Sequence, residues 1–262
     1  MNLNLQGKNA FVGGSSKGIG KAIAIELATL GANVIVVSRT AEALAQVIHE
    51  LPRVVEGQDH EFLVADYMDL EHLGTKVKGL ASERPIHILV NNTGGPAGGP
   101  IVEASSEAFQ KAFQKHVLCN QLLVQILSPG MIKENYGRII NVISTSVKAP
   151  LDNLGVSNTI RAAVANWAKT TANELGRYGI TVNNILPGMT ETERLWEIVA
   201  NNAKKGNLDK DVVAERMKKE IPLGRFGKPE EIAAAAAFLA SPAAAYITGT
   251  NITVDGGRTR SL

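Results

Sequence analysis

The chain has 262 residues, of which 45% are apolar and 20% charged, the mixture of an ordinary soluble globular protein. A formal charge of +2 gives no general attraction to nucleic acid, and no apolar run approaches the ~18 residues that read as a membrane span. The single cysteine, Cys119, excludes an internal disulfide and a multi-cysteine metal site. No secretory signal is recognisable at the N-terminus, so we expect a cytoplasmic protein.

Seven short runs rich in Val, Ile and Leu are predicted to be strands, because such runs are typical of strands buried on both faces of a parallel sheet. The runs are residues 8–13, 32–38, 61–66, 86–91, 138–144, 180–186 and 251–255. Helical patterns alternate with them at 18–30, 40–51, 69–83, 105–134, 155–178 and 228–240. The alternation predicts right-handed crossovers and one doubly wound α/β domain over residues 1–262.

The stretch 189–221 is polar, helical in pattern and outside this alternation. It predicts a helical insertion over the sheet near the C-terminal third, acting as a mobile substrate lid. Its apolar residues either line a substrate pocket or pack the lid down; they are Leu195, Trp196, Ile198 and Val199.

The first predicted strand leads directly into G-G-S-S-K-G-I-G, residues 13–20, and then into a helix. Glycine allows close approach of backbone to a phosphate, and the start of a helix adds free N–H groups and positive dipole. This context favours a dinucleotide-binding turn over a plain tight turn. The turn residues predicted to contact cofactor are Gly14, Ser16, Lys17, Gly18, Ile19 and Gly20.

The second predicted strand ends V-S-R-T, without the acid that usually binds the ribose 2′-hydroxyl of NAD. Arg39 at this position would attract a 2′-phosphate, and Lys17 would assist it. We therefore expect NADP(H) in preference to NAD(H). The alternative is that Arg39 is a solvated loop cation.

Several spaced segments resemble the short-chain dehydrogenase/reductase family, especially its β-ketoacyl carrier-protein reductase-like members. They are the glycine turn, V-N-N-T-G at 90–94, P-G-M-T-E-T at 187–192, P-L-G-R-F-G-K-P-E-E-I, Y-I-T-G and V-D-G-G. The resemblance covers nearly the whole chain. It implies a seven-stranded Rossmann sheet, a dinucleotide cofactor, a small-molecule or acyl-carrier-bound substrate, and a homotetramer.

The resemblance also assigns cofactor contacts beyond the glycine turn. It places Asp66 on the adenine amino group, with Tyr67 directly after it, and the 187–192 turn beside the nicotinamide. The positions assigned in this way are Asp66, Tyr67, Asn92, Gly94, Pro187, Gly188, Thr190 and Thr192.

Proteins of this family resemble one another in a Ser-Tyr-Lys constellation assisted by an asparagine. Ser144, in R-I-I-N-V-I-S, matches the serine. Ser157 stands where the tyrosine belongs, Arg161 where the lysine belongs, and His116 at the asparagine position. A serine hydroxyl is a far weaker acid than tyrosine, whose pKa is ~10. The catalytic set is therefore predicted to be Ser144, His116, Ser157 and Arg161, with a rebuilt proton relay.

The two ionisable residues of this set have different predicted roles. His116, as an imidazolium, would deliver a proton through Ser144, Ser157 or water. Arg161 lies on the apolar side of the 155–178 pattern and would meet ribose hydroxyls, a phosphate, an anionic substrate group or developing oxyanion charge. The alternatives are a hydrogen-bonded core histidine, a structural ion pair for Arg161, and a Ser144 that simply ends its strand.

The predicted function is an NADP(H)-dependent oxidoreductase that reduces a carbonyl or oxidises an alcohol, similar to 3-oxoacyl carrier-protein reductases. The missing tyrosine and lysine keep two alternatives open: a catalytically silent dinucleotide-binding sensor or scaffold, and a lyase or isomerase that uses the same pocket. The remaining histidines are scattered without carboxylates at ligand spacing, so no metal is expected.

Overall fold

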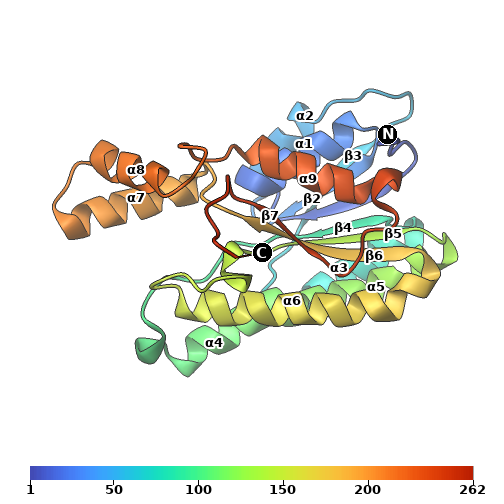
Figure 1. The fold of residues 1–262 in the computed structure, drawn as a ribbon. Helices are drawn as coiled ribbons and strands as arrows, with labels where there is room; N and C mark the ends of the chain where they lie inside the picture. The colour runs from blue at the N-terminus through green and yellow to red at the C-terminus, as the bar shows by residue number, and fades with distance from the viewer. Residues whose placement is uncertain (262) are drawn as a thin grey trace.

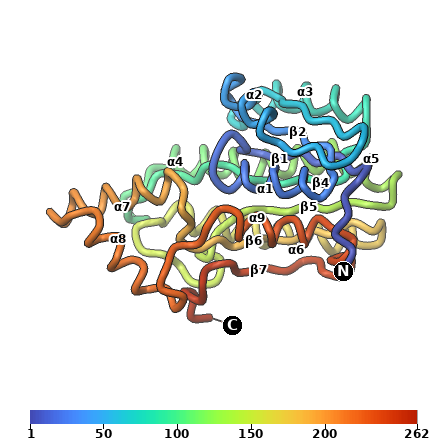
Figure 2. The backbone as a smooth tube through the Cα atoms, turned by 90° about the horizontal axis from the view of Figure 1, so that it is seen from above, coloured from blue at the N-terminus to red at the C-terminus, as the bar shows by residue number. Residues whose placement is uncertain are grey.

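The computed structural model describes residues 1–261 and contains a seven-stranded sheet in the order β3-β2-β1-β4-β5-β6-β7. Every neighbouring pair of strands is parallel, and Figure 2 shows the strands lying side by side. All seven predicted strands are present, so the predicted doubly wound α/β fold is confirmed. The strands are β1 (Asn9–Gly13), β2 (Asn33–Ser38), β3 (His60–Val64), β4 (Ile88–Asn91), β5 (Gly137–Val142), β6 (Ile180–Pro187) and β7 (Asn251–Val254).

Helices cover both faces of the sheet (Figure 1). One face packs against α1 (Gly18–Thr29), α2 (Ala41–Glu50) and α9 (Pro229–Ala240). The other face packs against α3 (Leu70–Glu83), α5 (Cys119–Lys133) and α6 (Gly155–Leu175). Short 3-10 turns are η1 (Ile101–Glu103), η3 (Thr145–Val147), η4 (Gly176–Tyr178) and η5 (Pro242–Ala244). Within residues 1–261, no helix combines the length and apolar character needed to cross a membrane.

The predicted helix at 105–134 is not one continuous α-helix. It begins as α4 (Ser106–Phe113), passes through the π-helical turn η2 (Gln114–Leu118), and continues as α5. A π turn inserts an extra residue, changes the direction of the side chains around it, and is frequent at functional sites. The turn contains His116, so its geometry decides where that side chain points.

The predicted insertion consists of α7 (Glu193–Gly206) and α8 (Lys210–Lys219). In Figure 1 this pair, drawn in orange, extends outward from one end of the sheet and does not lie over its face as expected. The two helices share a hydrophobic cluster of their own, in which Leu195 and Val199 are buried. These two residues therefore pack the pair together, whereas Trp196 is 47% exposed and meets Phe226 edge-on.

Four asparagines form a ladder across β4, β5, β6 and β7. Asn91 donates to Asn141, Asn141 to Asn184, and Asn184 to Asn251, each from Nδ2 to Oδ1 at 2.8 Å. The same residues are register partners in the sheet. Buried amides are costly unless hydrogen-bonded, so this ladder favours one register among otherwise interchangeable apolar strands.

We expect Asn141→Ala to destabilise the protein by about 2–5 kcal/mol, because Asn91 and Asn184 each lose a partner in the buried sheet. The free energy of unfolding is to be measured by urea denaturation. Asn202→Ala, at an exposed position of α7, is the control and should change it little. Equal stability of the two variants would show that the ladder does not stabilise the sheet.

Candidate active site

The predicted site residues gather where the parallel strands end. The glycine turn follows β1, Arg39 follows β2, Asp66 follows β3, and Ser144 follows β5. The chain leaves β1 toward β2 on one side and returns to β4 on the other, which makes a topological switch point. Open α/β sheets bind ligands in the crevice outside such a point.

The glycine turn requires glycine for conformation and for space. Gly14 and Gly18 adopt φ of +57° and +58°, in the left-handed region that favours glycine. A Cβ on Gly20 would lie 2.7 Å from Asn92 Nδ2. That same amide donates to the carbonyl oxygens of Gly13 and Gly14 at 3.1 and 3.2 Å. Asn92 therefore holds the turn against the end of β4.

The start of α1 is open to an anion. Its N-cap residue, Lys17, makes no side-chain cap bond, and the first turn contains no acidic residue. The backbone N–H groups after Lys17 and the positive end of the helix dipole are free to receive a phosphate. Ser16 and Ile19 are half-buried beside these groups. This cradle fits the pyrophosphate of a dinucleotide.

Lys17 contacts α7 in addition to bordering the turn. Its ammonium forms an ion pair with Glu193, at the first position of α7. Thr192 caps α7 and lies against Gly18, where a Cβ would be 3.3 Å from the Thr192 methyl group. The glycine turn and the start of α7 are thus in contact.

The adenosine end of the cleft is defined by Arg39 and Asp66. Arg39 is exposed and makes no ion pair with any residue of the described chain. Asp66 is half-buried and accepts a hydrogen bond from the Met68 N–H at 3.0 Å. Tyr67, in contrast, is buried beneath Gly13, and burial raises its pKa well above the usual value. The Tyr67 side chain thus supports the glycine turn from below, and its predicted contact to cofactor stays a prediction that only the Tyr67 backbone is placed to fulfil.

The turn after β6 is folded against the C-terminal V-D-G-G segment. A Cβ on Gly188 would lie 2.6 Å from the Asp255 Cβ, so the two segments approach too closely for another residue. Thr190 donates to the Gly188 carbonyl at 3.2 Å. Pro187 ends β6, and the turn leads from it to the start of α7.

His116 is buried, 3% exposed, and hydrogen-bonded through Nδ1 to Thr93 Oγ1 at 2.7 Å. Its Nε2 has no hydrogen-bond partner. Burial first, and then the positive charges of Arg161 and Lys115, lower the pKa of His116 to about 2. The ring is therefore neutral at physiological pH. A neutral ring contradicts the predicted imidazolium donor. The sequence prediction failed because it did not show how completely the ring is desolvated.

Arg161 is also buried, and Nη1 donates to the Val142 carbonyl at 3.0 Å. Its other terminal nitrogen lies 3.6 Å from the point where a side chain on Gly95 would begin. Burial lowers the pKa of Arg161 to about 10, so the guanidinium stays charged at neutral pH. No carboxylate of the described chain pairs with it, which argues against a structural ion pair.

The two predicted serines are half-buried. Ser157 lies one helical turn before Arg161 on α6, so the two side chains share a face. Ser144 lies two residues after Val142, the last residue of β5, whose carbonyl accepts from Arg161. The Ser144 Oγ accepts from the Ser146 N–H at 3.1 Å. Ser144 thus caps η3, and its hydroxyl proton is not used in that bond.

Sequence reasoning missed Thr93 and Lys115 as members of this site. Thr93 replaces the alanine of the N-N-A-G segment, and that replacement was visible in the sequence. Lys115 precedes His116. Its ammonium lies near Gly94 because of the π turn, which the sequence did not indicate.

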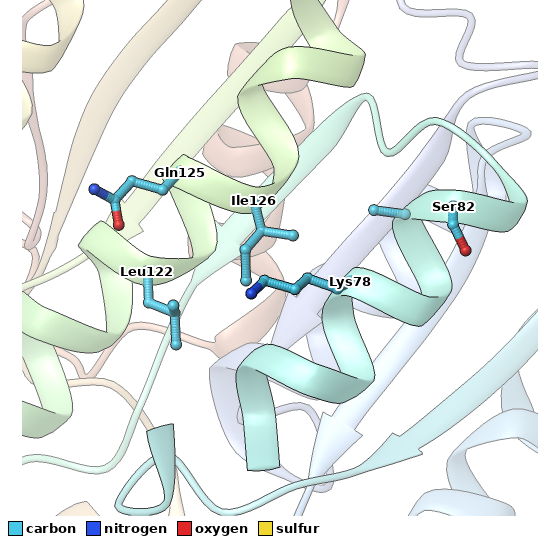
Figure 3. A pocket seen from close by; sticks show the side chains of 6 residues that line it. Lys78, Ser82, Leu122, Gln125 and Ile126 are labelled. Atoms are coloured by element: carbon cyan, nitrogen blue, oxygen red, sulfur yellow. The ribbon is translucent and has the colours of Figure 1, made fainter. Parts of the chain in front are cut away.

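A shallow groove between α3 and α5 lies away from these strand ends (Figure 3). It is lined by Lys78, Ala81, Ser82, Leu122, Gln125 and Ile126. None of the predicted site residues contributes to it. Residues 1–261 contain no group of three or more His, Cys, Asp or Glu arranged to hold a metal ion.

Comparison with known proteins places the chain in a family. Residues 14–259 match the family model described as enoyl-(acyl carrier protein) reductase. The NADPH-dependent reductase BacG of Bacillus subtilis is 32% identical over 256 residues, which cover 97% of this chain and 99% of that protein. The 3-oxoacyl-(acyl-carrier-protein) reductase FabG of Vibrio harveyi is 34% identical over 258 residues, covering 97% and 98%. The chain belongs to the short-chain dehydrogenase/reductase family.

Solved structures agree with this placement. The L-sorbose reductase from Gluconobacter frateurii, complexed with NADPH and L-sorbose, matches with a TM-score of 0.93 at 31% identity, with both chains fully covered. A single-residue variant of the actinorhodin polyketide ketoreductase with NADPH matches with a TM-score of 0.89 at 27% identity and covers 97% of each chain.

The buried neutral state of His116 predicts a stability loss in acid. The unfolded chain protonates this ring below its ordinary pKa of 6.5, whereas the folded protein keeps it neutral down to about 2. Unfolding therefore becomes easier as pH falls below 6.5. Between pH 7 and pH 5 this ring should cost about 2 kcal/mol, so His116→Asn should lose about that much less over the same range. Denaturation curves at both pH values measure the difference; parallel losses in both proteins would contradict it.

Proposed function

We propose that the protein is an NADP(H)-dependent carbonyl reductase or alcohol dehydrogenase. The observation that carries this proposal is the open N-terminus of α1 behind a turn in which Gly14 and Gly20 have no room for a side chain. Unpaired Arg39 at the end of β2, without an acid beside it, supports selection of a 2′-phosphate. The relatives whose names include NADPH agree with this cofactor.

The residues of the crevice would hold the cofactor along its length. Gly18 and Gly20 would bind the pyrophosphate, and Asp66 would bind the adenine. Asn92 and Gly94 would contact the cofactor from the end of β4. The turn 187–192 would border the nicotinamide. When bound, the nicotinamide supplies a hydride to a carbonyl carbon or accepts one from an alcohol.

The residues near Ser144 would handle the oxygen of the substrate. Ser144 and Ser157 would donate hydroxyl hydrogen bonds to that oxygen, and Ser157 would pass a proton from solvent to it. Arg161 stays positively charged without a carboxylate partner, so its field would stabilise negative charge that develops on the oxygen. Neutral His116 would hold the Thr93 hydroxyl in place through its hydrogen bond, and it would not act as an imidazolium acid.

The substrate is proposed to be a small carbonyl compound or an acyl group on a carrier, as in the 3-oxoacyl reductases among the relatives. The α7–α8 pair would act as the substrate lid, and half-exposed Trp196 is the side chain available to contact substrate. A homotetramer in the cytoplasm remains the expected setting; Phe113 and Leu118, exposed along α4 and η2, offer apolar contact surface for a second copy.

A silent dinucleotide-binding protein is the second candidate. It is favoured by one observation: neither Ser144, Ser157 nor neutral His116 is an acid comparable to tyrosine, and a guanidinium such as that of Arg161 keeps its proton in proteins.

Titration and turnover separate the two functions. We expect NADPH to bind at least about tenfold more tightly than NADH, and its absorbance to fall when ketone substrates are added. The panel should include 3-oxoacyl thioesters and keto sugars, followed by stopped-flow absorbance of the nicotinamide. Tight NADPH binding without turnover on any ketone would support the silent protein. Binding of neither nucleotide would overturn both functions.

Arg161→Met is expected to separate activity from stability. Removing a buried cation without a carboxylate partner should leave the melting temperature equal or higher. The rate of ketone reduction should fall about 10²–10³-fold, because the charge facing the substrate oxygen is lost. Arg177→Gln, at an exposed position just beyond the other end of α6, is the control and should change neither quantity. An unchanged rate in Arg161→Met would remove Arg161 from the chemistry.

A further inference from the structure

Lys115 brings an unexpected positive charge into the nucleotide cleft. It lies in η2, and Gln114 beside it donates to the Met68 carbonyl at 2.6 Å, which ties the π turn to the segment after β3. The Lys115 Nζ lies 3.8 Å from the point where a side chain on Gly94 would begin. Apart from residues 93–95 themselves, no other atom of the described chain comes within 4 Å of that point. The ammonium therefore borders the open space above Gly94.

The charge of Lys115 is not neutralised by the protein. The side chain is half-buried, and it forms no ion pair with any acid in residues 1–261. Burial lowers the pKa of Lys115 most, Arg39 lowers it further, and Asp66 opposes them. The Gln114–Met68 hydrogen bond places the π turn beside the segment after β3, which carries Asp66. Two cations therefore share the adenosine end of the cleft with one carboxylate.

The positions of these groups in the sheet narrow the choice of ligand. Arg39 follows β2 and Gly94 follows β4, so Arg39 and Lys115 approach the end of β1 from its two neighbouring strands. The open amides that suit the pyrophosphate belong to α1, which covers the other face of the sheet from η2. An anion bound between Arg39 and Lys115 would therefore be a group other than the pyrophosphate.

We propose that Lys115 is a second cation, beside Arg39, in the subsite for the 2′-phosphate of the cofactor's adenine ribose, and that it contributes to selection of NADP(H) over NAD(H). This inference rests on the proposed function. A phosphate with up to two negative charges offsets the repulsion between the two cations, and charge-assisted hydrogen bonds to phosphate are among the strongest in proteins. Asp66 opposes the lowering of the Lys115 pKa, and the formal charges of the two cations and the one carboxylate sum to a positive value.

The test uses fragments that contain only the adenosine end. Calorimetry measures binding of adenosine 2′,5′-bisphosphate and adenosine 5′-monophosphate to the full-length protein and to Lys115→Met. We expect the variant to bind the bisphosphate about 10- to 100-fold more weakly and the monophosphate within about twofold of the wild type. Lys115→Arg should retain the preference for the bisphosphate. Lys111→Met, one turn earlier and exposed on α4, is the matched control and should bind both as the wild type does.

Each other outcome identifies which idea has failed. If the wild type prefers the bisphosphate and Lys115→Met keeps the same preference, the inference about Lys115 is wrong and the proposed function stands. If the variant loses affinity for both nucleotides equally, Lys115 binds a part that they share, and the inference is again wrong. If the wild type itself does not distinguish them, the preference for NADP(H) in the proposed function also falls. Melting temperatures of all variants confirm that each is folded.

Discussion

The side-chain amide of Asn92 joins the two halves of the sheet at the point where the ligand must bind. By donating to the carbonyls of Gly13 and Gly14, it fixes the turn after β1 against the end of β4. That contact leaves room only for glycine at positions 14 and 20 and aims the start of α1 into the crevice. The parallel sheet then sets the positions of the other site residues, from Arg39 after β2 to Ser144 after β5, relative to this contact.

The site concentrates positive charge in a poorly solvated place. Arg161 and Lys115 lack carboxylate partners among the described residues, and their fields help to keep His116 neutral. Buried charges of one sign are costly to folding, and such costs are typical of sites that bind the opposite charge. A protein built only for stability would replace these residues with apolar ones. Their arrangement agrees with an anionic cofactor and with an oxygen that gains charge during reaction.

The sequence predicted the architecture well because buried parallel strands are continuous in Val, Ile and Leu, and the helices between them are long. It also indicated the glycine turn and the positions of Ser144, Ser157 and Arg161. It did not predict the π turn that orients Lys115, because one extra residue in a helix does not visibly change the spacing of the apolar residues. The protonation of His116 and the asparagine ladder depend on burial and strand register, which only the assembled fold determines.

The separate hydrophobic cluster of α7 and α8 has a consequence for how this chain diversifies. Most buried residues of the pair contact one another, and the start of α7 contacts the glycine turn through Thr192 and Glu193. The outer faces of α7 and α8 therefore tolerate sequence change at little cost to the sheet, whereas changes at the start of α7 also alter the contacts of the turn after β1.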